Sequence, residues 1–169
     1  MVKGARQQDL ITFLNAIRRI GAEYKIVRQG IIFSHSQNKL KSVEIETDTH
    51  PGFMTDWQQP FAVLLTQADG ISVIHETVYE DRFGYTQDLN LMGADIKVFS
   101  KCLGELSCRF NGLNFPHSAI INGLTKLKGN YLEVRDLRAG MVNVIAGLIA
   151  DGQSIISGVE EIDRGYFQL

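Results

Sequence analysis

The internal sequence repeats are the feature that most constrains the fold of this 169-residue chain. Residues 68–82 and 150–164 align in one register, with an Ala-Asp-Gly start and an Asp-Arg end in common. Residues 20–23 and 92–95 are also similar, in a second register with a shorter offset. A unit of this size does not bury its own faces, so neighbouring units are expected to pack around one shared core.

The two registers set the size of the repeated units. They predict a single domain built from two units, at approximately 1–80 and 81–169. The second unit is longer between its first strand and its helix, and its additional residues fall in 100–124. We expect these residues to form an elaborated surface segment.

Apolar residues follow helical spacing in some stretches and strand spacing in others. Periods of three and four residues predict helices over 10–20 and 57–68. Gly21 follows the first of them, as glycine often does at a helix end. Apolar runs and alternation predict strands at 24–27, 31–33, 42–47 and 71–74. This order of helices and strands predicts an α/β (α+β) fold.

The stretch 141–150 is apolar on nearly every side, with only Asn143 and Gly147 interrupting it. A helix that is apolar all round is typically buried all round. Central helices with sheets outside satisfy this pattern. A helix sandwiched between two larger layers satisfies it equally.

Composition excludes several classes of partner. The net charge is −2 and the cationic residues are scattered, which argues against nucleic acid. No apolar run approaches the ~20 residues that span a bilayer, which argues against a membrane. We therefore expect a cytoplasmic protein.

The thiols and imidazoles show no familiar metal-binding spacing. Cys102 and Cys108 lie close in sequence, but without a CxxC pattern. The four histidines, at positions 35, 50, 75 and 117, are too widely separated for a local ligand motif. We expect no metal site, no disulfide framework and no cofactor, and phosphate-binding glycine loops are also lacking.

Asp56 lies where a helix is predicted to begin, directly after Pro51-Gly52 and three more residues. Position alone favours a structural role, in which Asp56 caps the helix and Gln59 completes a capping box. A functional carboxylate at a rigid helix start is the alternative.

Arg138 occupies the place equivalent to Asp56 in the second unit, in the register that aligns Ala68 with Ala150. A cation in the first turn of a helix opposes the helix dipole. Arg138 could therefore serve an anion site at this helix start. A surface ion pair between Asp136 and Arg138 is an equally weighted alternative.

Five motifs in order, over nearly the whole chain, resemble those of the UDP-N-acetylglucosamine enolpyruvyl transferases. The motifs are Pro51 to Gln58, His75 to Phe83, Met92 to Asp95, Asp136 to Ala139 and Ile162 to Tyr166. The resemblance implies an EPSP synthase-like fold. One lobe of this fold is an inside-out α/β barrel-like structure, with repeated β/α units, buried helices and outer mixed sheets.

The resemblance also implies roles for individual residues. Asp56 matches a catalytic aspartate that contacts the sugar 3-hydroxyl and handles a proton. Val78 matches a position whose backbone contacts UDP-N-acetylglucosamine, and Arg164 matches an arginine that engages phosphoenolpyruvate. Three further polar residues match positions that line or brace the cleft: Arg82, Asp136 and Arg138. Taken alone, Asp81-Arg82 and Asp163-Arg164 could be solvated ion pairs in turns.

Other family features have no counterpart in the chain. The resemblance implies a second lobe that carries an acid cysteine, and neither Cys102 nor Cys108 matches it. The family's Lys-Asn pair, which binds phosphoenolpyruvate, is also unmatched. We therefore expect one partial lobe, inactive alone, of an enzyme that starts peptidoglycan synthesis. A non-catalytic sugar-nucleotide binding or interaction module on the same fold is the alternative.

Overall fold

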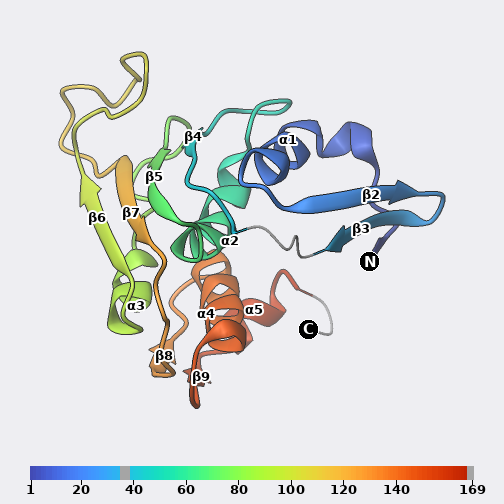
Figure 1. Ribbon diagram of the computed structural model, residues 1–169. Helices are drawn as coiled ribbons and strands as arrows, with labels where there is room; N and C mark the ends of the chain where they lie inside the picture. The colour runs from blue at the N-terminus through green and yellow to red at the C-terminus, as the bar shows by residue number, and fades with distance from the viewer. Residues whose placement is uncertain (35–38, 167–169) are drawn as a thin grey trace.

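The structure is a computed structural model and describes residues 1–34 and 39–166. Figure 1 shows helix α2 near the centre, with a four-stranded sheet on one side and helix α4 below it. The predicted α/β class is confirmed. His35 lies outside the described residues, so nothing follows for it.

The first part of the chain forms a small antiparallel sheet beside a helix. Strand β1 (Val2–Lys3) leads through a short 3-10 helix (Gln7–Asp9) into α1 (Ile11–Arg19). Strands β2 (Glu23–Val27) and β3 (Gly30–Ser34) then form a hairpin. The strand order is β1-β3-β2. The helix expected over 10–20 and the two strands expected after it are thus confirmed.

A four-stranded mixed sheet forms the middle of the molecule, in the order β4-β5-β7-β6. Strands β4 and β5 are parallel, and the other pairs are antiparallel. The elements are β4 (Glu44–Glu46), α2 (Thr55–Thr66), β5 (Gly70–His75), α3 (Thr86–Leu91), β6 (Asp95–Phe99) and β7 (Ser118–Gly123). This sheet joins strands from both sides of the predicted boundary at residue 80, so the repeats interlock.

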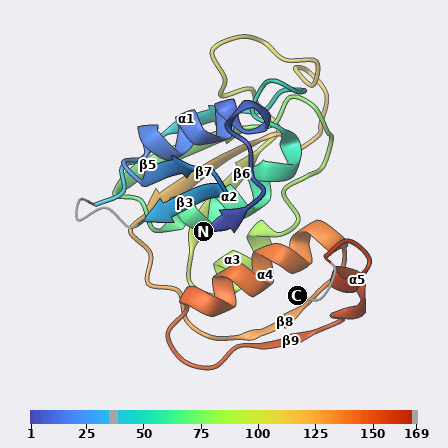
Figure 2. The ribbon, with the colours of Figure 1, turned by 90° about the vertical axis from the view of Figure 1, so that its right-hand side faces the viewer.

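The last part of the chain repeats the arrangement of β4, α2 and β5. Strands β8 (Tyr131–Glu133) and β9 (Ile155–Ser157) are parallel and connected by α4 (Leu137–Ile149). Figure 2 shows both strands running along one side of α4. The short helix α5 (Glu160–Asp163) follows and packs against α4.

Backbone hydrogen bonds reproduce the sequence similarity between residues 20–23 and 92–95. After α1, Ala22 N donates to Ile17 O, and after α3, Ala94 N donates to Leu89 O. Gly21 and Gly93 lie between them with φ of +85° and +99°, a conformation that glycine adopts without strain. The same glycine-terminated helix end therefore turns the chain into β2 and into β6.

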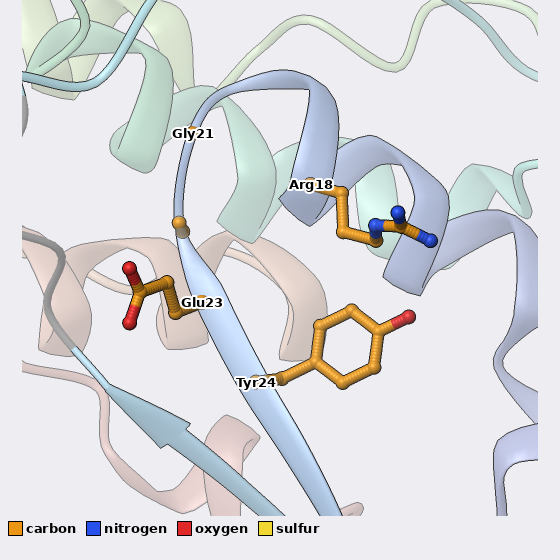
Figure 3. Close-up of a pocket in the computed structure, with 5 residues that line it drawn as sticks. Arg18, Gly21, Glu23 and Tyr24 are labelled. Atoms are coloured by element: carbon orange, nitrogen blue, oxygen red, sulfur yellow. The ribbon is translucent and has the colours of Figure 1, made fainter.

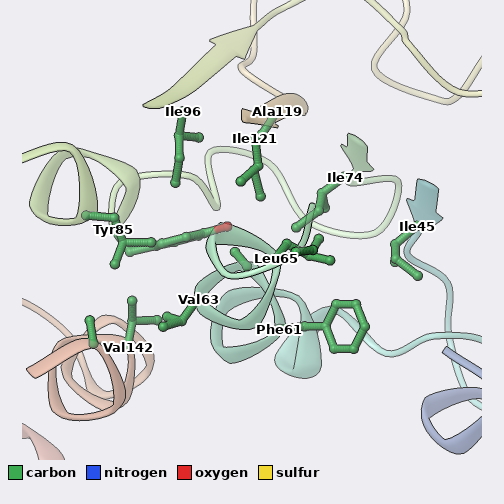
Figure 4. Packing of buried hydrophobic residues seen from close by; sticks show 14 of the residues in the cluster. Ile45, Phe61, Val63, Leu65, Ile74, Tyr85, Ile96, Ala119, Ile121 and Val142 are labelled. Atoms are coloured by element: carbon green, nitrogen blue, oxygen red, sulfur yellow. The ribbon is translucent and has the colours of Figure 1, made fainter. Parts of the chain in front are cut away.

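The core lies between the central sheet and the two long helices. Figure 4 shows Ile74, Ile96 and Ile121 of the sheet facing α2, and Val142 of α4 approaching from the opposite side. Leu65 of α2 is fully buried between them. Helix α2 is therefore the element on which sheet and second helix both pack.

Two sequence expectations need correction. Helix α4 is not buried all round, because Leu148 and Ile149 are 80% and 47% exposed. The predicted surface segment 100–124 is also too long. Residues 118–123 are strand β7, which lies between β5 and β6 and includes the fully buried Ala119 and Ile121. The elaboration is confined to 100–117.

No helix in the described ranges is long and apolar enough to cross a membrane.

The two faces of α4 give a direct test of this packing. Val142 is fully buried against the core, whereas Leu148 is 80% exposed. Val142→Ala is expected to lower the free energy of unfolding by about 1–3 kcal/mol, because it leaves a cavity. Leu148→Ala is the matched control and is expected to change it by less than about 0.5 kcal/mol. Urea unfolding of the 169-residue chain measures both. Equal losses would show that α4 is packed on both faces.

Candidate active site

The starts of α2 and α4 meet, and their equivalent residues form an ion pair. Asp56 and Arg138 are each the second residue of their helix, and they are 82 positions apart. Arg138 Nε donates to Asp56 Oδ1 at 2.6 Å. The internal repeat thus places a carboxylate opposite a guanidinium at one helix junction.

The capping role considered for Asp56 is wrong. Met54 occupies the N-cap position of α2, and no side chain caps this helix start. Asp136, in contrast, caps α4: its Oδ1 accepts from the backbone N of Arg138 at 2.8 Å and of Ala139 at 3.0 Å. The alternative prediction, a surface ion pair between Asp136 and Arg138, is also wrong. The Arg138 side chain forms its ion pair with Asp56.

A second arginine approaches the same carboxylate oxygen. Arg82 Nη1 lies 3.3 Å from Asp56 Oδ1, and the Arg82 side chain is only 9% exposed. The Tyr79 ring lies over this guanidinium, with the ring centroid 4.3 Å from Cζ. A guanidinium over an aromatic face gains electrostatic attraction and is held in one orientation. Three of the predicted residues, Asp56, Arg82 and Arg138, are therefore in direct contact.

The two arginines favour the ionised form of Asp56. Partial burial raises the pKa of this carboxyl group, but the hydrogen bond and charge of Arg138, with those of Arg82, outweigh it. The net pKa of Asp56 lies below its usual value. The Asp56 hydrogen bond conversely raises the pKa of Arg138. Asp56 is thus an anion at neutral pH and is held by two cations.

Glu76, which the sequence reasoning missed, orders the loop that follows β5. This fully buried carboxylate accepts from the backbone N of Val78 at 2.9 Å and of Tyr79 at 3.0 Å. Its other donors are Thr47 Oγ1, Thr55 Oγ1 and Gln58 Nε2. A carboxylate inside the motif from His75 to Phe83, two residues after the strand predicted at 71–74, was the available signal.

Val78 lies at the exposed end of this network. Its backbone N bonds Glu76, and its carbonyl accepts from the Arg109 guanidinium of segment 100–117. A carbonyl oxygen has a second lone pair and can accept from a ligand as well. The predicted contact of Val78 with a nucleotide sugar is thus compatible with its present hydrogen bonds.

A cleft of about 240 Å³ borders the charged cluster. Its lining includes seven polar or charged side chains: Gln59, Tyr79, Asp81, Arg82, Tyr85, Asp136 and Arg138. A larger hollow of about 560 Å³ lies elsewhere, between the end of α1 and β2, where Arg18, Glu23 and Tyr24 line it (Figure 3). We assign the site to the smaller cleft, because cationic groups there converge on one carboxylate.

Arg164 does not join the cluster around Asp56. Its guanidinium pairs with Glu161, three residues earlier, at 2.6 Å, and its side chain is 72% exposed. Asp81, in the corresponding turn of the first unit, has a φ of +54°. The two Asp-Arg copies therefore differ in their surroundings: Arg82 is nearly buried, whereas Arg164 is open to solvent.

Curated relatives match this chain over almost its full length. It is 53% identical to a UDP-N-acetylglucosamine 1-carboxyvinyltransferase of Protochlamydia amoebophila (strain UWE25), over 98% of the chain and 36% of that protein. It is 49% identical to the enzyme of the same name from Chlamydia abortus, over 98% of the chain and 38% of that protein. The chain thus spans little more than a third of the relatives it matches.

A solved structure shares the fold. The enolpyruvyl transferase NikO from Streptomyces tendae superposes with a TM-score of 0.77 and 23% identity, covering 93% of this chain and 33% of that one. The family model of EPSP synthase (3-phosphoshikimate 1-carboxyvinyltransferase) matches residues 2–169. The chain therefore belongs to the EPSP synthase family.

Proposed function

We propose that this chain is part of a UDP-N-acetylglucosamine 1-carboxyvinyltransferase. Such an enzyme moves the enolpyruvyl group of phosphoenolpyruvate to the 3-hydroxyl of UDP-N-acetylglucosamine and releases phosphate, in the first committed step of peptidoglycan synthesis. The two substrates are its small-molecule partners. The observation that carries the proposal is the contact of Asp56 with Arg138 and Arg82 beside a cleft. The similarity to the two chlamydial relatives supports it.

The charges of the cluster suit an anionic substrate. Phosphoenolpyruvate carries a carboxylate and a phosphate, and guanidinium groups bind both through paired hydrogen bonds. An arriving anion competes with Asp56 for Arg138 and Arg82. When the two arginines contact the substrate and no longer Asp56, the pKa of Asp56 rises toward its usual value. The carboxylate is then a better proton acceptor. Substrate binding thus prepares Asp56 to accept the proton of the sugar hydroxyl.

The loop after β5 suits the nucleotide sugar. Glu76 fixes the backbone of Val78 and Tyr79, so the Val78 carbonyl is presented to a ligand from a rigid position. Donors and acceptors that are already ordered lose little entropy when a ligand binds. Asp136 orders the start of α4 in the same way and thereby aims Arg138 at the cleft.

The proposed enzyme is completed by a second lobe, which supplies a general acid and further phosphoenolpyruvate contacts. The 169-residue chain is therefore expected to be inactive alone. The full enzyme is expected in the cytoplasm. A non-catalytic sugar-nucleotide binding module on the same fold remains the alternative. The ion-paired state of Asp56 favours the enzyme, because simple binding of a sugar hydroxyl needs no carboxylate held by two arginines.

Asp56→Asn in the full-length protein distinguishes the two functions. Asparagine keeps the shape and the hydrogen bond to Arg138 but accepts no proton. Turnover, measured as phosphate release, is expected to fall about 100- to 10,000-fold. Asp69→Asn, which removes a carboxylate paired with Lys39 outside the cleft, is the matched control. Full turnover in Asp56→Asn would favour the binding module.

The lowered pKa of Asp56 predicts an acid-dependent stability. The stabilisation from the ionised carboxylate is present above the unfolded-state pKa of about 3.9 and is lost as pH falls through the lower folded-state pKa. Stability of the 169-residue chain is therefore expected to fall less steeply below about pH 4 in Asp56→Asn. Urea unfolding, followed by fluorescence of the single tryptophan, Trp57, measures this. If the free energy of unfolding fell equally steeply with pH in the wild-type chain and in Asp56→Asn, the prediction would be contradicted.

The two Asp-Arg copies are expected to differ in phosphoenolpyruvate binding. Arg164→Lys keeps the charge but loses the planar fork, and we expect about 10- to 100-fold weaker binding. Arg82→Lys should have a smaller effect on this substrate, because only Arg164 matches the family's phosphoenolpyruvate motif. Titrations of both full-length variants, with the nucleotide sugar present, give the comparison. An equal or larger loss in Arg82→Lys would reverse the assignment.

A further inference from the structure

Two cysteines and two histidines converge at the base of segment 100–117. Cys102 Sγ lies 3.3 Å from Cys108 Sγ and 3.3 Å from His117 Nε2. One ligand atom from each of His75, Cys102 and Cys108 lies within 4.8 Å of the others. The two imidazole rings are 5.4 Å apart, centroid to centroid. This cluster is separate from the residues assigned to the cleft.

Sheet pairing, not local spacing, brings the four side chains together. His75 ends β5 and is paired in register with Ser118, which begins β7, so His117 lies beside it. Ser118 is also paired with Phe99, at the end of β6. Segment 100–117 therefore starts and ends at this edge of the sheet, and its two cysteines fold back over the histidines. The expectation of unrelated thiols and imidazoles overlooked this register.

The His117 imidazole is oriented so that its Nε2 faces the thiol of Cys102. His117 Nδ1 donates to the carbonyl of Phe115 at 2.7 Å, which leaves a lone pair on Nε2. His75 Nδ1 lies 2.8 Å from Ser118 Oγ. His75 Nε2 is buried without a hydrogen-bond partner among the described residues, and the residue is 1% exposed. Metal-binding histidines typically have one nitrogen held in this way, with the other on the metal.

We propose that His75, Cys102, Cys108 and His117 bind a zinc ion. Two thiolates and two imidazoles are a common ligand set of structural zinc sites. Bond lengths of about 2.3 Å for Zn–S and about 2.0–2.1 Å for Zn–N, at tetrahedral angles, place the ligand atoms roughly 3.3–3.8 Å apart. The Cys102–Cys108 and Cys102–His117 separations of 3.3 Å are already at this value. The His75 ligand atom, which lies within 4.8 Å of both thiols, and the His117 ring have to move closer to the remaining ligands. With four protein ligands the site has no open position, so it stabilises structure.

Segment 100–117 packs closely on the cluster. Gly104 packs so closely on His75 that a Cβ there would lie 3.0 Å from Nε2 and 3.1 Å from a Glu46 carboxylate oxygen. The segment thus closes over the cluster.

The zinc ion would fasten segment 100–117 to the sheet. Arg109 follows the ligand Cys108 directly, and its guanidinium donates to the carbonyl of Val78 and lies 3.9 Å from Glu80. Ordering the segment therefore also orders its contact with the loop after β5. Zinc binding itself does not depend on the proposed transferase activity, and its test reads metal and thiols, not turnover.

The first experiment measures metal binding and thiol protection in the full-length protein. The reduced protein is stripped with a chelator and then titrated with Zn²⁺, or with Co²⁺ as a spectroscopic probe. Cobalt is expected to give a tetrahedral visible spectrum with thiolate-to-metal charge transfer. Zinc is expected to block alkylation of Cys102 and Cys108, read by peptide mass spectrometry. Unchanged alkylation of both cysteines at saturating zinc would overturn the proposal.

Substitutions then identify the ligands. Cys102→Ser and Cys108→Ser are each expected to weaken zinc binding at this site at least about 100-fold. Ser118→Ala, which removes the contacts of Ser118 Oγ with the His75 ring and with the backbone N of Leu103, should weaken it about 10- to 100-fold. His50→Ala is the matched control and should leave affinity unchanged, because His50 lies outside the cluster. Wild-type zinc affinity in both cysteine variants would refute the site. If those variants fail to fold, alkylation of the unsubstituted protein still decides.

Discussion

Packing on both sides of helix α2 is the constraint on which the remaining structure depends. The central sheet covers one side of α2 and α4 covers another, and Leu65 lies fully buried between these layers. The polar residues Gln58, Gln59 and Thr66 are buried along with the apolar ones. Because a buried helix cannot turn or slide without opening this core, the start of α2 is fixed with respect to both neighbours. Asp56, the second residue of α2, is therefore held in a fixed position.

The meeting of two helix starts has an electrostatic consequence. Each start presents unpaired backbone N–H groups and a partial positive charge, so two adjacent starts repel one another and attract anions. Asp56 supplies one negative charge at the junction, and Asp136 supplies another by capping α4. Arg138 and Arg82 add positive charge on the same side. The charges of these side chains at the junction thus nearly cancel. An incoming anion would form contacts with the two arginines in place of the contacts that Asp56 makes with them. This is the physical basis of the proposed competition with Asp56.

The sequence predicted local elements well and their surroundings poorly. The spacing of Phe13, Leu14 and Ile17 specified α1 because helical periodicity is a local property. The exposure of Leu148 could not be predicted, because hydrophobicity does not reveal which neighbours cover a helix. Family motifs located Asp56, and only the structure showed that its carboxylate meets Arg138 and does not cap its helix. The cysteine and histidine cluster depends on strand register, which no spacing along the chain encodes.

The hydrogen bonds of Glu76 divide into a fixed half and a reversible half. Its Oε1 accepts from two backbone N–H groups, which cannot change direction, and from the Thr47 hydroxyl. Its Oε2 accepts from the Thr55 hydroxyl and the Gln58 amide. A hydroxyl can rotate to become an acceptor, and an amide can flip to present its oxygen, which in Gln58 has no partner among the described residues. A glutamine at position 76 could thus keep every bond of the loop by reversing two donors, whereas an apolar residue would strand both backbone amides.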